Sequence, residues 1–300
     1  MTLSRQTIQS IQTRVLDWYR ENKRDLPWRK IMDPYRILVS EMMLQQTQVA
    51  RVIPKYENFL ALFPTIAALA AAPSSDVIRA WKGLGYNRRA LNLQRSAQQI
   101  VTLYDGRLPS DLKVLRSFPG IGRYTAGAIR NFAFGLDTPA VDTNVKQFLD
   151  HFVPNDPKDS TPHHSPSGEV SSVKERASTP SIRSENNYYE LAQQLIPKGK
   201  AKEWLHAVMD YSALVLKPNQ TSGSTLRVKP RKTEAFMGSN RYVRGRIIDW
   251  LRDKPQTRQA LFTAIAKPID LTEQRFDALL ETLEQEGFLT HRQSTLRLVE

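Results

Sequence analysis

Apolar residues recur at helical spacing through most of the first 150 residues of this chain. Near the N-terminus the pattern covers residues 4–22 through Ile8, Ile11, Val15 and Leu16, a spacing typical of an amphipathic helix. The same spacing predicts further helices over 35–50, 51–63, 65–71, 74–81, 86–104, 110–117, 123–134 and 143–152. Few segments alternate with the period of two that a half-buried strand requires. The pattern predicts an all-α fold for this region.

Two polar segments divide the rest of the chain. Residues 154–187 are rich in Pro, Ser, Thr, Asp and Glu, which predicts a disordered insert. Helices are expected again at 187–196 and 200–216. Residues 218–239 form a second polar linker that holds the basic cluster "LRVKPRK" at 226–232. We therefore expect one domain over 1–217 and a second over 240–300.

The last 60 residues have a different pattern. Three amphipathic segments, "RYVRGRIIDWLRD", "TRQALFTAIA" and "TEQRFDALLETLEQEGFL", precede "LTHRQSTLRLVE", which reads as a hairpin. Three helices and a two-stranded wing predict a small winged helix-turn-helix domain of the α+β class. The alternative is a helical appendage that contacts another protein.

Charge and cysteine content narrow the function classes. Lys and Arg number 43 against 30 Asp and Glu, giving a net charge of +13, which favours a polyanionic partner such as nucleic acid over a membrane surface; a merely soluble basic protein is the alternative. The chain has no cysteine, which excludes disulfides, thiolate metal sites and a cysteine nucleophile. No apolar run reaches the ~18 residues of a membrane helix, and no signal peptide is visible. We expect a soluble cytoplasmic protein, associated with the nucleoid.

Two glycines flank one isoleucine in "SFPGIGRYTAGAI", residues 117–129. Glycine tolerates positive φ and lets another backbone come close. A turn of Gly120, Ile121 and Gly122 that leads into a helix directs free N–H groups outward, where they favour an anion such as a phosphate. The alternative is a tight turn between two helices.

Two carboxylates are candidates for catalysis. Glu41 lies in the apolar segment "ILVSEMMLQQ", and burial keeps a carboxyl group protonated and able to act as a general acid; a cap or an ion pair with Arg36 is the alternative. Asp142 in "PAVDTNVKQF" precedes a helix, so it is either an N-cap or a carboxylate that faces developing positive charge. Cleavage of a glycosidic bond requires two carboxylates in different environments.

Aromatic and planar polar side chains accompany these carboxylates. Trp28 and Arg29 lie in "LPWR", Gln46 and Thr47 in "QQTQ", and Tyr86 in "GLGYNRR". Flat rings, amides and guanidinium groups suit a flipped base and the gap that it leaves in a duplex. Each such ring is also a candidate for the core.

Together these segments resemble the MutY-type adenine DNA glycosylases of the helix-hairpin-helix superfamily. The matching strings are "LPWR", "DPY", "VSEMMLQQTQV", "GLGY", "FPGIGRYTAGAI" and "VDTNV", in the family's order over about residues 12–152. The match fades through 186–216 and is absent after about 218. The resemblance implies a two-lobed α-helical domain with the base pocket between lobes, a monomer bound to double-stranded DNA at a mismatched or damaged base pair, and a hairpin that holds a DNA phosphate with a monovalent cation.

The resemblance also implies roles for single residues. Glu41 would protonate adenine at N7, and Asp142 would stabilise the deoxyribose cation, with Asn144 beside it. Tyr124 takes the place where bifunctional relatives such as endonuclease III have a lysine, and a tyrosine cannot form the Schiff base of strand cleavage. Trp28 and Arg29 would line the adenine pocket. The side chains that wedge into the duplex opposite the lesion would be Gln46, Thr47 and Tyr86. Further DNA contacts are expected from Gly120, Ile121, Gly122, Arg123 and Arg88. Outside the resemblance, the basic residues of the C-terminal segment are expected to add phosphate contacts, namely Arg241, Arg244, Arg246 and the cluster at 226–232.

The chain departs from the family in four respects. Leu216 stands where the first cysteine of a four-iron, four-sulfur cluster is expected, so a clusterless protein without cofactor is implied. The C-terminal 8-oxoguanine-reading domain is not visible. His206 aligns with the glutamine or glutamate that contacts the target base. Asn87 and Thr143 replace a frequent tyrosine and a frequent glycine.

Three functions follow as hypotheses. The first is a monofunctional glycosylase of base excision repair that removes adenine mispaired with 8-oxoguanine or guanine. The second is a thymine or uracil mismatch glycosylase on the same scaffold, suggested by His206 and the missing reader domain. The third is a non-catalytic DNA-binding protein.

Overall fold

The computed structural model describes residues 2–154, 183–217 and 236–300. Most of the predicted insert and linker, and the basic cluster at 226–232, lie outside the described residues. The chain divides into unit 1, Met1–Asp25 with Arg123–Ser224, and unit 2, Leu26–Gly122 with Thr225–Glu300. The domain boundaries expected from the sequence stay predictions. No helix within the described ranges is long and apolar enough to cross a membrane.

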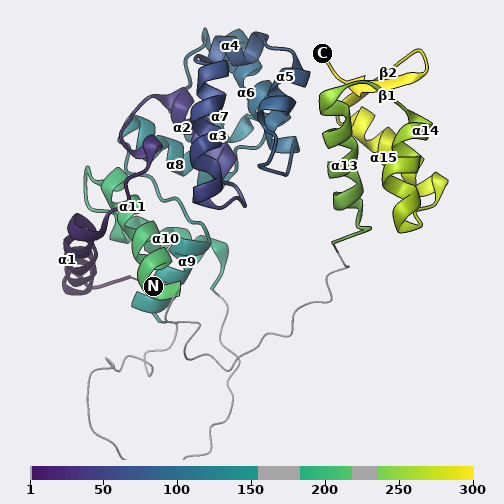
Figure 1. Ribbon diagram of the computed structural model, residues 1–300. Coiled ribbons are helices and arrows are strands. Elements are labelled where there is room, and N and C mark those ends of the chain that lie inside the picture. The colour runs from purple at the N-terminus through teal and green to yellow at the C-terminus, as the bar shows by residue number, and fades with distance from the viewer. Residues whose placement is uncertain (1, 155–182, 218–235) are drawn as a thin grey trace, which may run out of the picture. The chain divides into compact units, whose positions relative to one another are not determined.

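Unit 1 is a group of helices that come from two separate segments of the sequence (Figure 1). Its elements are α1 (Arg5–Asn22), α8 (Arg123–Phe134), α9 (Thr143–Phe152), α10 (Glu185–Leu195), α11 (Ala201–Tyr211) and a π-helical turn (Ser212–Leu216). Helix α1 packs against α11. The fully buried Asp210 of α11 accepts from the Arg24 side chain at 2.6 Å, which fixes the chain just after α1.

The first part of unit 2 contains the remaining helices of the predicted α region. They are a 3-10 turn (Pro27–Arg29), α2 (Pro34–Leu44), α3 (Val49–Leu62), α4 (Ile66–Ala71), α5 (Ser74–Ala80), α6 (Arg88–Tyr104) and α7 (Leu112–Ser117). The single helix expected over 35–50 is wrong, because α2 ends at Leu44 and Gln46 turns the chain with a φ of +55°. The other expected helices are confirmed to within a few residues.

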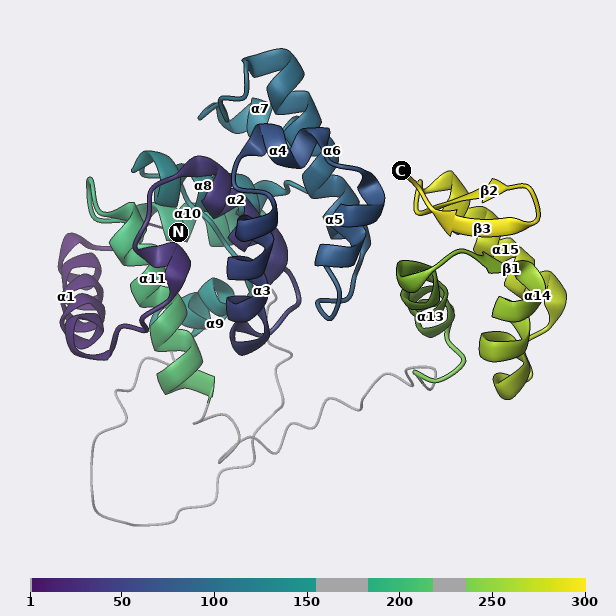
Figure 2. The ribbon, with the colours of Figure 1, turned by 45° about the horizontal axis from the view of Figure 1, so that its top comes forward.

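The C-terminal part of unit 2 follows the order helix, strand, helix, helix, strand, strand. Its elements are α13 (Asn240–Asp253), β1 (Gln256–Thr257), α14 (Arg258–Leu261) with two short turns over 262–269, α15 (Glu273–Gln285), β2 (Leu289–Arg292) and β3 (Thr295–Leu298). The predicted hairpin is confirmed as β2 and β3, with Leu289 opposite Leu298. The sheet has three strands in the order β1-β3-β2, all antiparallel (Figure 2). The expected two-stranded wing therefore missed the third strand, β1.

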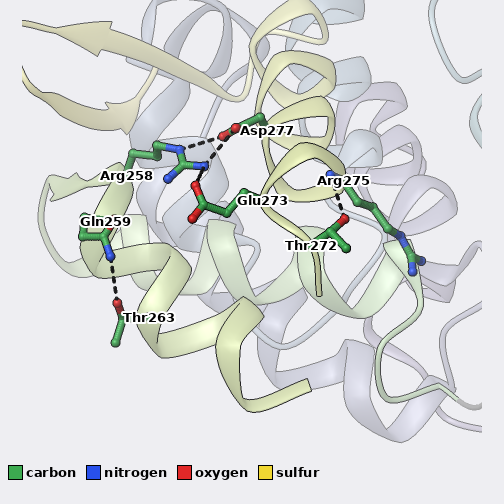
Figure 3. Close-up of polar contacts among 7 residues, drawn as sticks. All are labelled: Arg258, Gln259, Thr263, Thr272, Glu273, Arg275 and Asp277. Carbon is green, nitrogen blue, oxygen red and sulfur yellow. Dashed lines mark hydrogen bonds and ion pairs between the residues drawn. The ribbon is translucent and has the colours of Figure 1, made fainter. Parts of the chain in front are cut away.

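Polar contacts join α14 to α15 in this C-terminal part (Figure 3). The Arg258 guanidinium donates to Asp277 at 2.7 Å and to Glu273 at 2.9 Å. The hydrogen bond from Arg258 holds the pKa of Asp277 below its ordinary value. Thr272 caps α15 by accepting from the Arg275 amide. Apolar residues complete the core, among them Phe276 and Leu283.

The C-terminal core continues into the first part of unit 2. Ile78 of α5 and Leu91 of α6 belong to the same apolar cluster as α13. Arg252 of α13, only 5 % exposed, donates to the Ile78 carbonyl at 3.2 Å and to Asn87 at 2.9 Å. A buried guanidinium needs such acceptors. These contacts join the two sequence segments of unit 2.

Candidate active site

Glu41 occupies the buried face of α2. Asp33 caps this helix by accepting from the Arg36 amide at 2.8 Å, and Pro34 takes the first helical position, where its missing N–H costs nothing. Glu41 is 5 % exposed and precedes the fully buried methionines 42 and 43. The apolar segment around Glu41 therefore predicted its burial correctly. Because Glu41 belongs to unit 2 and Asp142 to unit 1, their pairing at one site stays a prediction.

Asp142 has both carboxylate oxygens engaged at the start of α9. One oxygen accepts from the Val145 amide at 2.8 Å, and the other accepts from the Asn144 side-chain amide at 2.6 Å. The N-cap interpretation is confirmed, and it leaves the functional interpretation open.

Close packing of two backbones brings the chain to Asp142. A Cβ on Gly127 of α8 would lie 2.7 Å from the Pro139 carbonyl oxygen, closer than carbon and oxygen atoms approach. Glycine at this position therefore lets the 139–141 segment run against α8 before α9 begins. The sequence pattern around "TAGAI" gave no indication of this role for its glycine.

Asn144 joins Asp142 to the end of the α11 segment. Its side-chain oxygen accepts from Lys217 Nζ at 2.8 Å, and its backbone carbonyl accepts from the Ser212 hydroxyl at 2.9 Å. The sequence pattern did not indicate Lys217 or Ser212, because residues about 70 positions apart give no local signal.

The Gly-Ile-Gly turn follows α7 as predicted. The Ile121 amide donates to the Phe118 carbonyl at 3.1 Å, and Gly120 has a φ of +80°. A Cβ on Gly120 would lie 2.7 Å from Cε, the movable end of the Met42 side chain, so the positive φ is the main reason that glycine is favoured here. Gly122 needs no positive φ, and a Cβ there would meet open space. The Gln45 side chain donates to the Gly120 carbonyl at 3.1 Å, which ties the hairpin to the end of α2.

Two of the three predicted pocket residues, Trp28 and His206, are packed within their own units. Trp28 is 7 % exposed and meets Tyr56 edge-on, with ring centroids 5.5 Å apart. His206 of α11 is 6 % exposed and stacks on Phe132 at 4.3 Å. Arg29 lies partly exposed at the end of the 3-10 turn.

Two further predicted residues lie in the first turn of α8. Tyr124 is partly exposed. The Arg123 guanidinium lies 3.5 Å from the centre of the Tyr189 ring and donates to Asn186 at 2.9 Å. Arg123 is therefore held within unit 1, and its DNA contact stays a prediction.

The predicted wedge residues lie on two turns of unit 2. Gln46 and Tyr86 have φ values of +55° and +44°, a conformation that costs about 1–2 kcal/mol in a residue with a side chain. Both are exposed. Thr47 Oγ1 lies 3.4 Å from the Leu84 carbonyl oxygen and links the two turns.

A groove with a volume of about 820 Å³ runs along these turns in unit 2. Arg241 of α13 stacks on the Tyr86 ring at 4.1 Å. Arg244 pairs with Glu286 at 2.5 Å, and the more exposed Arg88 lies 3.8 Å from the same carboxylate. The groove lining includes Gln46, Tyr86, Arg51, Arg88, Arg241, Arg244 and Arg246, a basic surface typical of one that attracts phosphate.

The fold and the sequence define the class of protein. Residues 39–165 match the HhH-GPD superfamily of base excision DNA repair proteins, and the chain is a DNA glycosylase that acts on N-glycosyl bonds.

The chain belongs to the MutY-type adenine DNA glycosylase family. It is 35% identical over 296 residues to the adenine DNA glycosylase of Mycobacterium tuberculosis (strain CDC 1551 / Oshkosh), covering 93% of this chain and 90% of the relative. It is 34% identical over 264 residues to the adenine DNA glycosylase of Mycolicibacterium smegmatis, covering 82% of this chain and 83% of the relative. The human adenine DNA glycosylase is 44% identical over 144 residues, 45% of this chain and 26% of the relative.

Solved structures share the fold. A thermostable thymine-DNA glycosylase is 25% identical with a TM-score of 0.59, covering 72% of this chain and 90% of that chain. A trapped endonuclease III-DNA covalent intermediate is 20% identical with a TM-score of 0.53, covering 70% of this chain and 86% of that chain.

The described residues do not fit an iron–sulfur cluster. Leu216, where the resemblance places the first ligand, is 6 % exposed in the π-helical turn after α11. A leucine side chain has no atom that can ligate iron, and the chain has no cysteine. Among the described residues, no group of three or more His, Asp or Glu side chains is placed to hold a metal ion.

Proposed function

We propose that this glycosylase releases adenine mispaired with 8-oxoguanine or guanine in double-stranded DNA. The observation that carries the proposal is the 35% identity to an adenine DNA glycosylase along 93% of the chain. The net charge of +13 and the arginine-lined groove support a duplex as the partner. A monomer and a hairpin-bound monovalent cation remain parts of this proposal.

The two carboxylates divide the chemistry. Glu41 donates a proton to adenine N7, the C1′–N9 bond breaks, and its electron pair leaves with the base. Asp142 is the negative charge that faces the oxocarbenium ion at C1′. Water then adds to C1′ and loses a proton, so the products are adenine and an abasic site. The hydrogen bonds to Asp142 from Asn144 and Val145 support this role because they hold the carboxylate in one orientation.

Tyr124 supports a monofunctional reaction. A phenol cannot form the imine that precedes strand cleavage, whereas a lysine at this position can. DNA strands should therefore break only after alkali treatment. Trp28, Arg29 and His206 are proposed to contact the target base, and the hairpin residues Gly120–Gly122 with Arg123 are proposed to hold its strand.

Substitution of the carboxylates tests this mechanism. Glu41→Gln and Asp142→Asn each remove a charge or a transferable proton with little change of shape. Both should lower adenine excision at least 10²-fold while duplex binding stays within about threefold, because a general acid such as Glu41 alone contributes about 10²–10⁴-fold. Excision by Glu41→Gln at the wild-type rate would exclude Glu41 as the acid.

A second candidate is excision of thymine or uracil opposite guanine. The 25% identity to a thymine-DNA glycosylase over 72% of the chain favours it, as does His206 at the position aligned with the base-contacting glutamine or glutamate.

The C-terminal segment 240–300, whose element order resembles a winged helix, is proposed to add phosphate contacts through Arg241, Arg244 and Arg246.

A further inference from the structure

Arg89 is a buried cation at the start of α6. Its residue is 6 % exposed, and its two terminal nitrogens make six hydrogen bonds of 2.6–3.1 Å. The acceptors are five backbone carbonyl oxygens and one hydroxyl. A buried guanidinium usually pairs with a carboxylate. The bonds of Arg89 to neutral backbone acceptors therefore suggest that its role is to hold the backbone.

The acceptors belong to two separate turns. Nη1 bonds the carbonyls of Met42, Met43 and Gln45, at the end of α2. These carbonyls lie at the negative end of the helix that carries Glu41, where a cation is favourable. Nη2 bonds the carbonyls of Leu84 and Gly85 and the hydroxyl of Thr47.

Each of these turns carries one exposed side chain in the left-handed conformation. Gln46 follows the Gln45 carbonyl directly, and Tyr86 follows the Gly85 carbonyl directly. Such backbone geometry persists only where the surroundings fix it. The Arg89 guanidinium supplies that fixation for both turns at once. Its Cζ also lies 5.7 Å from the Tyr86 ring centre and 5.4 Å from the Trp81 ring centre.

We propose that Arg89 is a positioning residue for duplex opening, which presets Gln46 and Tyr86 as one rigid wedge. This inference rests on the proposed function, in which those two side chains enter the duplex. The guanidinium stays charged at neutral pH, since burial lowers the pKa of Arg89 only to about 10. Lysine cannot replace it, because one ammonium nitrogen has three donors and cannot reach six acceptors on two turns.

The test uses Arg89→Lys in the full chain, with Arg107→Lys, an exposed arginine of the same unit, as control. The substrate is a duplex with adenine opposite 8-oxoguanine and 2-aminopurine beside the adenine. Fluorescence of 2-aminopurine reports unstacking, and single-turnover assays at saturating enzyme report excision. Arg89→Lys should lower both the unstacking amplitude and the excision rate at least tenfold, with duplex Kd within threefold. Arg107→Lys should match the wild type.

A double-substitution cycle separates positioning from loss of fold. If Arg89 acts through the wedge, adding Arg89→Lys to a variant that lacks both wedge side chains, Gln46→Ala with Tyr86→Ala, should slow excision less than threefold further. If Arg89→Lys merely reduced the folded fraction, its rate loss would multiply the rate loss caused by removing the wedge. That result would overturn the proposal. Thermal melting sets the assay temperature below the transition of every variant. If Arg89→Lys does not fold, Thr47→Val removes one acceptor and should lower unstacking three- to tenfold.

The wild-type protein separates this inference from the proposed function. If the wild type does not release adenine, the proposed function is wrong. The role of Arg89 is then still tested by the 2-aminopurine signal, which reports unstacking without excision. Release of adenine by the wild type and by Arg89→Lys within twofold overturns the role of Arg89 alone.

Discussion

The side-chain amide of Asn144 donates to the carboxylate of Asp142 at 2.6 Å, while Lys217 donates to the oxygen of the same amide at 2.8 Å. Asn144 therefore connects a lysine at the end of the described α11 segment to the proposed catalytic carboxylate. The amide nitrogen of Asn144 can only donate and its oxygen can only accept, so the ammonium of Lys217 selects the oxygen and leaves the nitrogen to face Asp142.

Loss of this amide should slow the chemical step. Asn144→Ala removes a hydrogen bond to a charged group, worth about 1.5–3 kcal/mol, so excision should fall about 10- to 100-fold. Duplex affinity should stay within threefold. Thr143→Ala, at an exposed neighbouring position, should keep the wild-type rate. Equal single-turnover rates for Asn144→Ala and wild type would remove Asn144 from the mechanism.

The hairpin should tolerate a methyl group at one glycine and reject it at the other. Gly120→Ala places Cβ against Met42 at a φ of +80°, and we expect it to lower the free energy of unfolding by about 1–3 kcal/mol. Gly122→Ala meets open space and should leave stability within about 0.5 kcal/mol. Urea unfolding measures both values, and equal stability of the two variants would contradict the strained, crowded backbone assigned to Gly120.

Arg241 should contribute to the salt dependence of binding. If it contacts one phosphate, Arg241→Gln should reduce the slope of log affinity against log salt concentration by about 0.9. Substitution is preferable to removal of residues 240–300, because removal would expose Ile78 and Leu91 of the shared core. Fluorescence anisotropy at several salt concentrations gives the slope, with Arg107→Gln as control. An unchanged slope would favour a protein partner for this segment.

Asp277 should stabilise the C-terminal part only at higher pH. Its pKa is lowered by the hydrogen bond from Arg258, so its contribution is present above the ordinary aspartate pKa and disappears as pH falls through the lowered value. The pair is partly exposed, so Asp277→Asn should cost at most about 1 kcal/mol at pH 7. That difference should vanish in acid. A difference that persists below the aspartate range would contradict the ion pair as its source.

Local signals made much of the fold predictable. The helices α8 and α9 begin and end as expected, because glycine, proline and the capping Asp142 mark their limits. The helix expected over 35–50 failed at Gln46, since no Gly or Pro marks the turn and Arg89, more than 40 residues away, holds it. The two-residue strand β1 is too short to show a period of two.

At the candidate site, the burial and capping of single residues were predictable, and the contacts between distant residues were not. Burial of Glu41 follows from its apolar neighbours, and the capping bond of Asp142 follows from its place before a helix. The burial of Arg89 is not visible in the sequence, because an arginine in a helical segment is usually exposed, and Lys217 is 73 residues from its partner Asn144. Both contacts depend on segments that the fold alone brings together.

Single-turnover excision on four duplexes would establish which base this glycosylase releases. The duplexes hold adenine opposite 8-oxoguanine, adenine opposite guanine, thymine opposite guanine and uracil opposite guanine, and alkali reveals abasic sites. We predict fast release of adenine, at least 100-fold faster than release of either pyrimidine, with no strand cleavage before alkali. Release of thymine or uracil without release of adenine would contradict the proposed function and assign the enzyme to pyrimidine mismatches.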